Sequence, residues 1–515
     1  MKNRRFQLKG RYRSGYARGR VKDLQNISEA VEKKYGKYPE KVLQFGEGNF
    51  LRAFVDWMID KANENGEYEG SIVLCQPIEG GERIREFFTE QNGEYTVVMR
   101  GIENGEPTER IRPITSVSRC INAYADYEEL MKLAESPDLE TVVSNTTEAG
   151  IAYREGDRLT DTPPASFPAK VTQFLYRRFK AFDGDPDKGL LFLPVELIDN
   201  NGAELKRIVL KYADEWNLEP EFISWVKDNN EFTSTLVDRI VTGYPREQAA
   251  EFCEKFGYED NLIDTCELFN LWVIEGDSKW QDVLPVHKSG ANVIWTDDVK
   301  PYKKRKVRIL NGGHTGTVLA AYLAGHDIVL DFMNDPVFAK YLDGLFFEEI
   351  IPTLDLPEEE LKEFAEAVKD RFSNPYIKHR LLDISLNSCS KFNARNLPTL
   401  LDYQQETGKI PARLSFGLAS LIKFYDCERK EDGTCAGHRA DGSEYPVRDD
   451  DEVLKAFEEA WKLGDVQKTA ETILGNTDFW SGKDLTEVPG LLDTVTGYLK
   501  EMENTPIEQI VEQIG

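Results

Sequence analysis

The sequence has only five histidines, no long apolar run and no cysteine pattern of the kind found in disulfide-rich domains. No stretch approaches about 18 consecutive apolar residues, so we expect no membrane-spanning helix. The seven cysteines are odd in number and scattered along 515 residues, unlike the disulfide framework of a small secreted domain. We therefore expect a cytoplasmic protein.

Basic residues are outnumbered, with 64 Lys and Arg against 91 Asp and Glu and a formal net charge of −27. A charge of this sign repels phosphate backbones and anionic lipids, which makes nucleic acids and membrane surfaces poor candidate partners. The hydrophobic content of 40% is sufficient for large buried cores. The length allows about two to four domains.

Residues 1–20 differ from the rest of the chain, because they hold eight Lys and Arg and no acidic residue. They also lack the apolar segment of a secretory signal peptide. We interpret this head as a mobile tail, with a transit peptide or a weak anion-binding arm as alternatives. Residues 1–40 are accordingly assigned to a basic, flexible extension.

The motifs of several enzyme classes are also missing. HExxH, GxSxG and GxxxxGK[ST] do not occur, which excludes zincin, serine hydrolase and P-loop chemistry of the usual kind. Cys427, Cys435 and His438 have ligand-like spacing, but they lie in a polar stretch and the pattern provides no fourth ligand. We therefore predict no metal site.

Short apolar runs alternate with a helical pattern in the first half of the chain, and four of them indicate buried strands: residues 41–45, 71–76, 141–146 and 190–198. A helix is predicted between the first two strands, over residues 50–66, and this order is typical of a parallel α/β sheet. After about residue 300 long amphipathic segments dominate, for example residues 358–372. We predict an α/β fold with two domains: a parallel-sheet domain over residues 41–298 and a mostly α-helical domain over residues 299–515.

A glycine-containing loop, QFGEGNFLRA, directly follows the first predicted strand. Gly46 and Gly48 would let the backbone approach a pyrophosphate, whose charge the following helix N-terminus would stabilise, as in a Rossmann-like domain. Leu51 replaces the third glycine of the usual fingerprint, so a tight turn without a ligand is the alternative. The acid that binds the ribose in such folds is absent after the second strand, and nearby Arg83 and Arg85 leave NADP open beside NAD.

A second candidate site is the segment KVRILNGGHTG, in which Lys306, Asn311 and His314 fall on one broad helix face. The cations at Lys303, Lys304 and Arg305 would favour a neutral Lys306 amine, which could exchange a proton with a substrate oxygen. The Asn311 amide could then donate to the developing alkoxide. The alternative is a solvated helix with one hydrogen-bonded histidine.

These segments resemble a known family, the polyol-specific long-chain dehydrogenases that include mannitol dehydrogenase. KVRILNGGH is similar to the family's Lys-x4-Asn-x2-His signature, and further stretches are similar to family members that act on sugar acids: residues 44–57, 144–151, 234–246, 297–315 and 374–392. The resemblance implies NAD-dependent, reversible reduction of the keto group of tagaturonate to altronate. Fructuronate reduction and mannitol oxidation are the alternatives within the family, and an NAD-binding sensor is the alternative outside enzymes.

The resemblance also implies roles for individual residues. Lys306 would be the general acid/base, Asn311 an oxyanion donor, His314 a substrate contact, and Asp238 an acid that supports the site. NAD would be bound by Phe45, Gly46, Gly48, Asn49, Phe50, Arg52, Ser144, Asn145, Thr146 and Thr147.

The substrate site differs from the family pattern at one position, and a sugar acid substrate requires one additional residue. Mannitol-type members have a second oxyanion donor, an Asn, where this sequence has Leu197, and Asn201 is the candidate to replace it. A sugar acid also needs a cation for its carboxylate. The candidates are Arg371, Lys378, Lys391 and Arg395, and the run of cations from Lys300 to Arg308 is expected to make the cleft locally positive.

Overall fold

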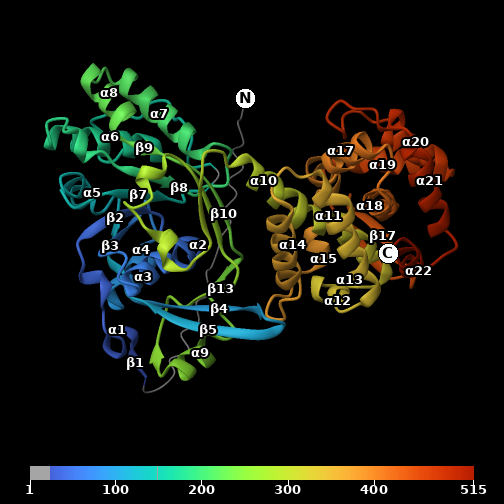
Figure 1. The fold of residues 1–515 in the computed structure, drawn as a ribbon, viewed down its shortest axis with the longest axis horizontal. Helices are drawn as coiled ribbons and strands as arrows, with labels where there is room; N and C mark the ends of the chain where they lie inside the picture. Colours follow the sequence, from blue (N-terminus) through green and yellow to red (C-terminus); the bar gives the residue numbers. More distant parts are fainter. Residues whose placement is uncertain (1–23, 148) are drawn as a thin grey trace, which may run out of the picture.

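The computed structural model describes residues 24–147 and 149–515, which form two domains joined near residue 300 (Figure 1). The N-terminal domain, coloured blue to yellow-green, contains the extended sheets, and the C-terminal domain, yellow to red, is mostly helical. The predicted fold class, an α/β domain followed by a mostly helical one, is confirmed.

A six-stranded parallel sheet forms the centre of the N-terminal domain. Its strands, in chain order, are β2 (Glu40–Phe45), β3 (Ser71–Gln76), β6 (Val117–Asn122), β7 (Thr141–Ser144), β8 (Leu191–Pro194) and β9 (Glu231–Phe232). They lie in the order β6-β3-β2-β7-β8-β9 and all neighbours are parallel. This is the strand order of a dinucleotide-binding fold, in which the ligand lies where the order reverses, here between β2 and β7.

Alternate residues of these strands enter two separate cores, one on each face of the sheet. Val42 and Leu74 pack with α3 (Trp57–Glu64) on one face. Leu43 and Phe45 pack on the other face with helices α6 (Phe167–Ala181) and α7 (Asn201–Glu215). Because both faces are covered, the strands are continuous apolar runs, which is why they could be recognised in the sequence.

Two smaller sheets extend the N-terminal domain towards the C-terminal domain (Figure 1). One contains β4 (Tyr95–Glu103), β5 (Glu106–Ile114), β11 (Val241–Gly243) and β13 (Asp264–Glu267), and the other contains β10 (Ser234–Asp238), β14 (Leu271–Glu275) and β15 (Val293–Thr296). None of these strands is among the four predicted from the apolar runs. Their importance for the site is that β10 and β13 end in the acids Asp238 and Glu267.

One long helical segment enters the C-terminal domain and carries the second candidate site. It begins as α10 (Lys300–Lys306), passes through a π-helical turn (Val307–Asn311) and continues as α11 (Gly312–Ala324). Close packing explains the glycines of α11: a Cβ on Gly313 would lie 2.5 Å from the Phe346 ring. Helix α14 (Glu358–Phe372), whose bounds match the predicted segment, lies on the side that faces the N-terminal domain (Figure 1).

The polar stretch near residue 430 forms a small antiparallel sheet on the helical domain. Its strands are β16 (Cys427–Arg429), β17 (Cys435–His438) and β18 (Glu444–Val447). Cys427 and Cys435 belong to the hydrophobic core of the C-terminal domain. Among the described residues there is no group of three or more potential metal ligands. No helix in the described part of the chain is long and apolar enough to cross a membrane.

Part of the expected flexible extension is folded, which corrects its assigned bounds. Strand β1 (Gln25–Asn26) pairs in parallel with β12 (Tyr258–Glu259), and Ile27 is fully buried. The Lys33 Nζ donates to the Asn92 and Ser118 carbonyl oxygens at 2.6 and 2.8 Å. Residues 24–40 therefore belong to the N-terminal domain, and the remainder of the predicted extension, residues 1–23, lies outside the described residues.

A buried acidic pair lies behind the glycine loop. Asp56 accepts a hydrogen bond from the Tyr95 hydroxyl at 2.7 Å, and Asp264 lies 3.9 Å from Arg52 Nε. Burial raises the pKa of both carboxyls to about 7. In the folded protein they bind protons over a pH range in which the unfolded chain has released them.

Asp264→Asn should therefore change the pH dependence of stability. Since the native carboxyl binds the extra proton between roughly pH 4 and 7, wild-type stability falls as pH rises through this window, by at most about 1.4 kcal/mol per unit and per group. The Asn variant lacks one such group, so its free energy of unfolding relative to that of wild type should increase between about pH 5 and pH 8. Urea unfolding at both pH values checks this, with the exposed Asp138→Asn as control. A wild-type-to-variant difference that is independent of pH would show that Asp264 does not titrate as stated.

Candidate active site

The glycine loop lies at the reversal point of the sheet. Gly46 has φ of +123°, its N–H donates to the Cys75 carbonyl at 2.9 Å, and a Cβ there would lie 3.0 Å from the Asn145 carbonyl oxygen. Gly48 precedes the helix that begins at α2 (Asn49–Leu51), and a Cβ on it would meet nothing within 4 Å. The loop thus combines a backbone conformation that only glycine adopts easily with open space at the start of a helix, which fits a dinucleotide pyrophosphate.

The loop that follows β7 forms the facing wall. The Asn145 N–H donates to the Phe45 carbonyl at 3.0 Å, which joins the two loops. Asn145, Thr147, Ala149 and Leu197 line a pocket of about 470 Å³. The pocket lies at the carboxyl ends of β7 and β8, where ligands of this fold bind.

Several of the residues predicted to bind the cofactor are directed into the protein. Arg52 is buried: its Nη1 donates to the Leu262 carbonyl at 2.5 Å and its Nη2 donates to Asn49 Oδ1. Phe45 is buried with its ring edge on Phe167, the centroids being 5.1 Å apart. Phe50 stacks on Phe54. The side chains of Arg52 and Phe45 therefore support the loop from within the protein, and their contact with the cofactor stays a prediction.

The hydroxyls of Ser144 and Thr146 are bound to Glu196, a residue that the sequence analysis missed. Glu196 is buried; it accepts from the Thr146 N–H and Oγ1, both at 2.9 Å, and from Ser144 Oγ at 3.1 Å. Burial raises the pKa of Glu196, against the effect of these hydrogen bonds. Glu196 thus positions the loop after β7. An acid within the apolar run over residues 190–198 was the available signal.

Asn201 does not replace the second oxyanion donor. It is fully buried, its Nδ2 donates to the carbonyls of Pro194 and Glu196 at 3.0 Å, and its Oδ1 accepts from the N–H of Gly202 and Thr235 at 2.9 Å. These bonds tie α7 to the neighbouring strands and use the whole amide. Leu197, by contrast, is 64% exposed and lines the pocket.

Lys306 is the last residue of α10 and reaches the N-terminal domain. Its Nζ donates to the Val237 carbonyl at 2.8 Å and lies 3.6 Å from Asp238 Oδ1. The Lys306 side chain is 17% exposed, against 5% for that of Asp238. A largely buried ammonium is thus placed at the junction of the two domains and fixed by one carbonyl and one carboxylate.

The cations that we expected around Lys306 are paired elsewhere. Lys303 pairs with Asp199, Lys304 pairs with Asp355 at 2.9 Å, and the Arg305 guanidinium lies over the Phe364 ring at 4.5 Å. Asp199 lies in the loop after β8, so its exposed pair with Lys303 shows that α10 lies next to the carboxyl edge of the parallel sheet.

Asn311 and His314 lie on the same continuous helical segment as Lys306. In the π-helical turn, hydrogen bonds span five residues, so Asn311 returns to the side of Lys306, and such turns are frequent at functional sites. The His314 ring stacks on Phe372, with centroids 4.0 Å apart, and meets the His379 ring edge-on at 5.2 Å. Asn311 Oδ1 and His314 Nε2 are buried atoms with no hydrogen-bond partner among the described residues.

Burial, together with positive charge nearby, holds the pKa of His314 well below its ordinary value. The charges come from His379, Arg371, Arg395 and Lys391. The imidazole is therefore neutral at neutral pH, and it suits a hydrogen bond with a neutral hydroxyl rather than proton donation as an imidazolium.

Arg371 joins the two domains and is not available for a substrate carboxylate, which corrects its predicted role. From the end of α14 its guanidinium donates to both oxygens of Asp238, at 2.9 and 3.0 Å, and to both oxygens of Glu267, at 2.9 Å. Burial works against its charge, but the two acids hold the pKa of Arg371 above its ordinary value. Burial likewise acts to raise the pKa of Asp238, yet Arg371 and Lys306 lower it.

The remaining cation candidates differ from one another. Lys378 is exposed. Lys391 and Arg395 lie on α16 (Ser388–Arg395), where Lys391 Nζ donates to the Ile384 carbonyl at 2.9 Å and Arg395 Nη1 donates to Thr315 Oγ1 at 3.2 Å. Among the described residues, no carboxylate lies within 4.0 Å of either charge, and burial lowers the pKa of both. Helix α16, rather than the paired cations of the Lys300–Arg308 run, therefore provides positive charge beside His314.

Comparison with known families matches almost the whole chain. The model of the mannitol dehydrogenase Rossmann domain matches residues 40–285, and that of the mannitol dehydrogenase C-terminal domain matches residues 298–503. The boundary between them falls at the start of α10.

Curated relatives and solved structures agree with this match. An altronate oxidoreductase of Escherichia coli O7:K1 is 47% identical over 469 residues, which cover 90% of this chain and 94% of that protein. The altronate oxidoreductase of Yersinia enterocolitica gives the same values. Among structures, a D-sorbitol dehydrogenase superimposes with a TM-score of 0.77 at 23% identity, covering 93% and 96% of the two chains. The mannitol 2-dehydrogenase of Pseudomonas fluorescens has a TM-score of 0.63 at 20% identity, covering 93% and 95%.

The two low-identity structures show a shared fold, and the domain matches and the 47% identity show shared ancestry. The chain belongs to the mannitol dehydrogenase family.

Proposed function

We propose that the protein is an NAD-dependent oxidoreductase that reduces the keto group of tagaturonate to altronate, reversibly. The observation that carries the chemistry is the placement of Lys306, at the junction of the domains, on one helical segment with Asn311 and His314. The 47% identity to altronate oxidoreductases supports the substrate, and the strand order and the open glycine loop support the cofactor.

The residues of the chain would have the following roles. NADH held at the glycine loop would supply a hydride to the keto carbon. Lys306 gives a proton from Nζ to the substrate oxygen during reduction and takes it back during oxidation. The Val237 carbonyl and Asp238 orient that Nζ, and the Asn311 amide donates a hydrogen bond to the same substrate oxygen. The buried carboxylate of Asp238 keeps its charge because Arg371 is bound to both of its oxygens.

The neutral His314 would bind a hydroxyl of the sugar chain, and the cations of α16 would bind the carboxylate. Arg395 bonds to Thr315, the residue next to His314, and it can still offer further N–H groups to an anion. Lys391 acts electrostatically on the same His314. A positive subsite of this kind is what distinguishes a sugar acid from a neutral polyol.

Arg395→Met should therefore lower kcat/KM for tagaturonate by about 10- to 100-fold, mainly by raising KM. This factor corresponds to the loss of one charged hydrogen bond, which contributes about 1.5–3 kcal/mol. Activity with the neutral analogue fructose should change by less than about threefold, because fructose has no carboxylate to lose. Lys391→Met should act in the same direction. Lys378→Met is the matched control, since it removes the same type of charge from an exposed position. If Lys378→Met impairs tagaturonate reduction and Arg395→Met does not, the assignment to α16 is wrong.

The function itself is tested by following NADH consumption with purified protein and a panel of keto sugars. Tagaturonate should have the highest kcat/KM, ahead of fructuronate, fructose and fructose 6-phosphate. Preference for fructuronate would retain the chemistry and change the substrate. If no keto sugar led to NADH consumption, the assignment as an enzyme would be wrong.

A further inference from the structure

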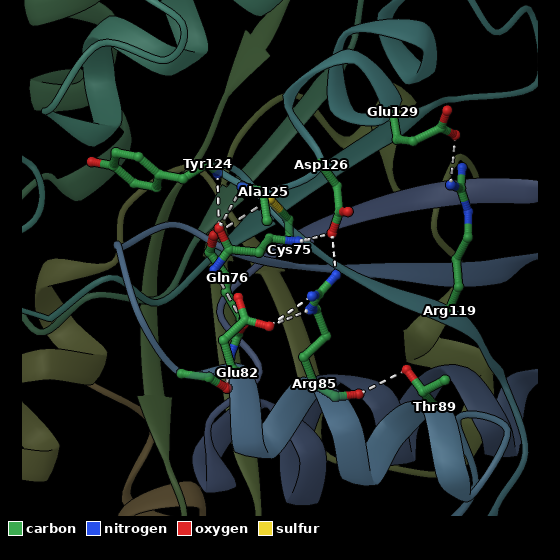
Figure 2. Close-up of polar contacts among 12 residues, drawn as sticks. Cys75, Gln76, Glu82, Arg85, Thr89, Arg119, Tyr124, Ala125, Asp126 and Glu129 are labelled. Carbon is green, nitrogen blue, oxygen red and sulfur yellow. Dashed lines mark hydrogen bonds and ion pairs between the residues drawn. The ribbon is translucent and has the colours of Figure 1, made fainter.

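The end of strand β3 lacks the acid that usually binds the adenosine ribose in this fold. Strand β3 ends with Cys75 and Gln76, and Cys75 is fully buried. Figure 2 shows Gln76 at this position, with Glu82 and Arg85 on the following helix, α4 (Glu82–Glu90), and Asp126 nearby. The ribose position is therefore occupied by a neutral amide within a group of charged side chains.

The side chain of Gln76 is fixed at both ends of its amide. Its Nε2 donates to Glu47 Oε1 and to the Gly81 carbonyl, both at 2.9 Å, and its Oε1 accepts from Asn122 Nδ2 at 3.3 Å. A Cβ on Gly81 would lie 2.5 Å from Gln76 Nε2, so this glycine makes room for the amide. One effect of the fixed amide is to hold the carboxylate of Glu47.

Glu47 stands between Gly46 and Gly48 in the glycine loop, so the loop itself provides an acid at the strand end. Only one of its carboxylate oxygens is bound by Gln76. The other carboxylate oxygen can accept hydrogen bonds from the vicinal hydroxyls of a ribose. An acid at the end of the second strand does this in related folds.

Arg85, one of the two arginines that left NADP open, is neutralised. Arg85 Nη1 donates to Asp126 Oδ2 at 2.8 Å, and its Nη2 donates to Glu82 Oε2 at 2.6 Å (Figure 2). Two acids thus pair with one guanidinium, and Glu47 adds a further negative charge. A 2′-phosphate would meet like charge here, so Arg85 does not provide the NADP site that the sequence left open.

We infer that Glu47, held by Gln76, binds the adenosine ribose hydroxyls of the cofactor and excludes a 2′-phosphate, and that it replaces the missing acid of β3 as the determinant of NAD over NADP. This inference rests on the proposed use of NAD. Glu47 acts here on the bound nucleotide and has no part in the proton transfer at Lys306.

The test uses the full-length protein and nucleotide fragments that cannot react. Calorimetric titration should show that wild type binds ADP-ribose at least about 100-fold more tightly than 2′-phospho-ADP-ribose, a ratio typical of a hydroxyl-binding acid that also repels charge. Glu47→Gln should weaken ADP-ribose binding about 10-fold and lower the ratio by about 10-fold or more. Gln76→Met should act in the same direction with a smaller effect, because the carboxylate remains but is released.

Glu79→Gln is the matched control, since it removes the same charge from an exposed residue three positions after Gln76. The inference would be overturned if Glu47→Gln unfolded normally on heating and kept the wild-type ratio of the two fragment affinities. It would also be overturned if Glu79→Gln alone lost that ratio. Failure of wild type to bind either fragment would instead overturn the proposed cofactor, so the two failures are distinguishable. Steady-state kcat/KM with NADH and NADPH should follow the same pattern as the fragments.

Discussion

Lys306→Ala is expected to lower kcat for tagaturonate reduction by about 10³-fold, within the range of about 10²- to 10⁴-fold for loss of a general acid/base. The Kd for NADH should change by less than about threefold, because Lys306 contacts Val237 and Asp238 and not the glycine loop. The fold should survive, since Asp238 keeps both of its bonds to Arg371.

Two further variants sharpen this prediction. Lys306→Arg keeps the positive charge but cannot release a proton near neutral pH, so it should be nearly as inactive as Lys306→Ala. Lys303→Ala removes a lysine one turn earlier, where it pairs with Asp199, and should retain most of the activity. Turnover by Lys306→Ala within about tenfold of wild type would contradict the proposed role. If wild type and variants all bind NADH but none reduces a keto sugar, the protein is the NAD-binding sensor that we considered as the alternative to an enzyme.

Arg371→Met is expected to destabilise the protein by about 3–5 kcal/mol, the cost of leaving buried carboxylates without their partner. Asp238 and Glu267 are 5% and 2% exposed, and between them they receive all four of the Arg371 hydrogen bonds described above. Because α14 supplies the arginine and β10 and β13 supply the acids, the loss would also loosen the junction that orients Lys306. Urea unfolding and activity should therefore both be affected.

The pH dependence of this loss follows from its cause. Without Arg371, burial would raise the pKa of Glu267 further above its unfolded value. The pKa of Asp238, which Arg371 and Lys306 together hold below its ordinary value, would also rise, so the folded variant would bind protons at higher pH than wild type. The deficit should then shrink as pH falls and grow as pH rises.

Adding Glu267→Gln to Arg371→Met should restore part of the stability, since one buried charge is removed. The control is Arg110→Met, which breaks a pair whose side chains are 55% and 42% exposed and should cost less than about 1 kcal/mol. A cost below about 1 kcal/mol for Arg371→Met as well would show that the buried cluster does not clamp the domains.

The local elements of this protein could be predicted from sequence because their signals are local. Strands β2 and β3 are buried on both faces and therefore form continuous apolar runs, and α14 has the amphipathic spacing of a surface helix over the residues predicted. The glycine loop and the segment from Lys306 to His314 were recognisable for the same reason, since each is contiguous.

The partners of the site residues could not be predicted in this way. Arg371 lies 133 residues from Asp238 and 104 from Glu267, and nothing in the local pattern around it distinguishes a buried clamp from a substrate contact. Asn201 was chosen for its position after β8, but the fold uses its whole amide to tie α7 to the strands. No role was predicted for Glu196 or Glu47, because only the tertiary hydrogen bonds show what they hold.

The central claim, a sugar acid site built around Lys306, is tested most directly by oxidation with NAD⁺ of two alcohols that differ in charge, altronate and mannitol. The account predicts that altronate yields NADH and tagaturonate, and that mannitol is oxidised with a kcat/KM at least about 100-fold lower, because the cations of α16 have no carboxylate to bind. Comparable or faster oxidation of mannitol, or no NADH from altronate, would contradict it.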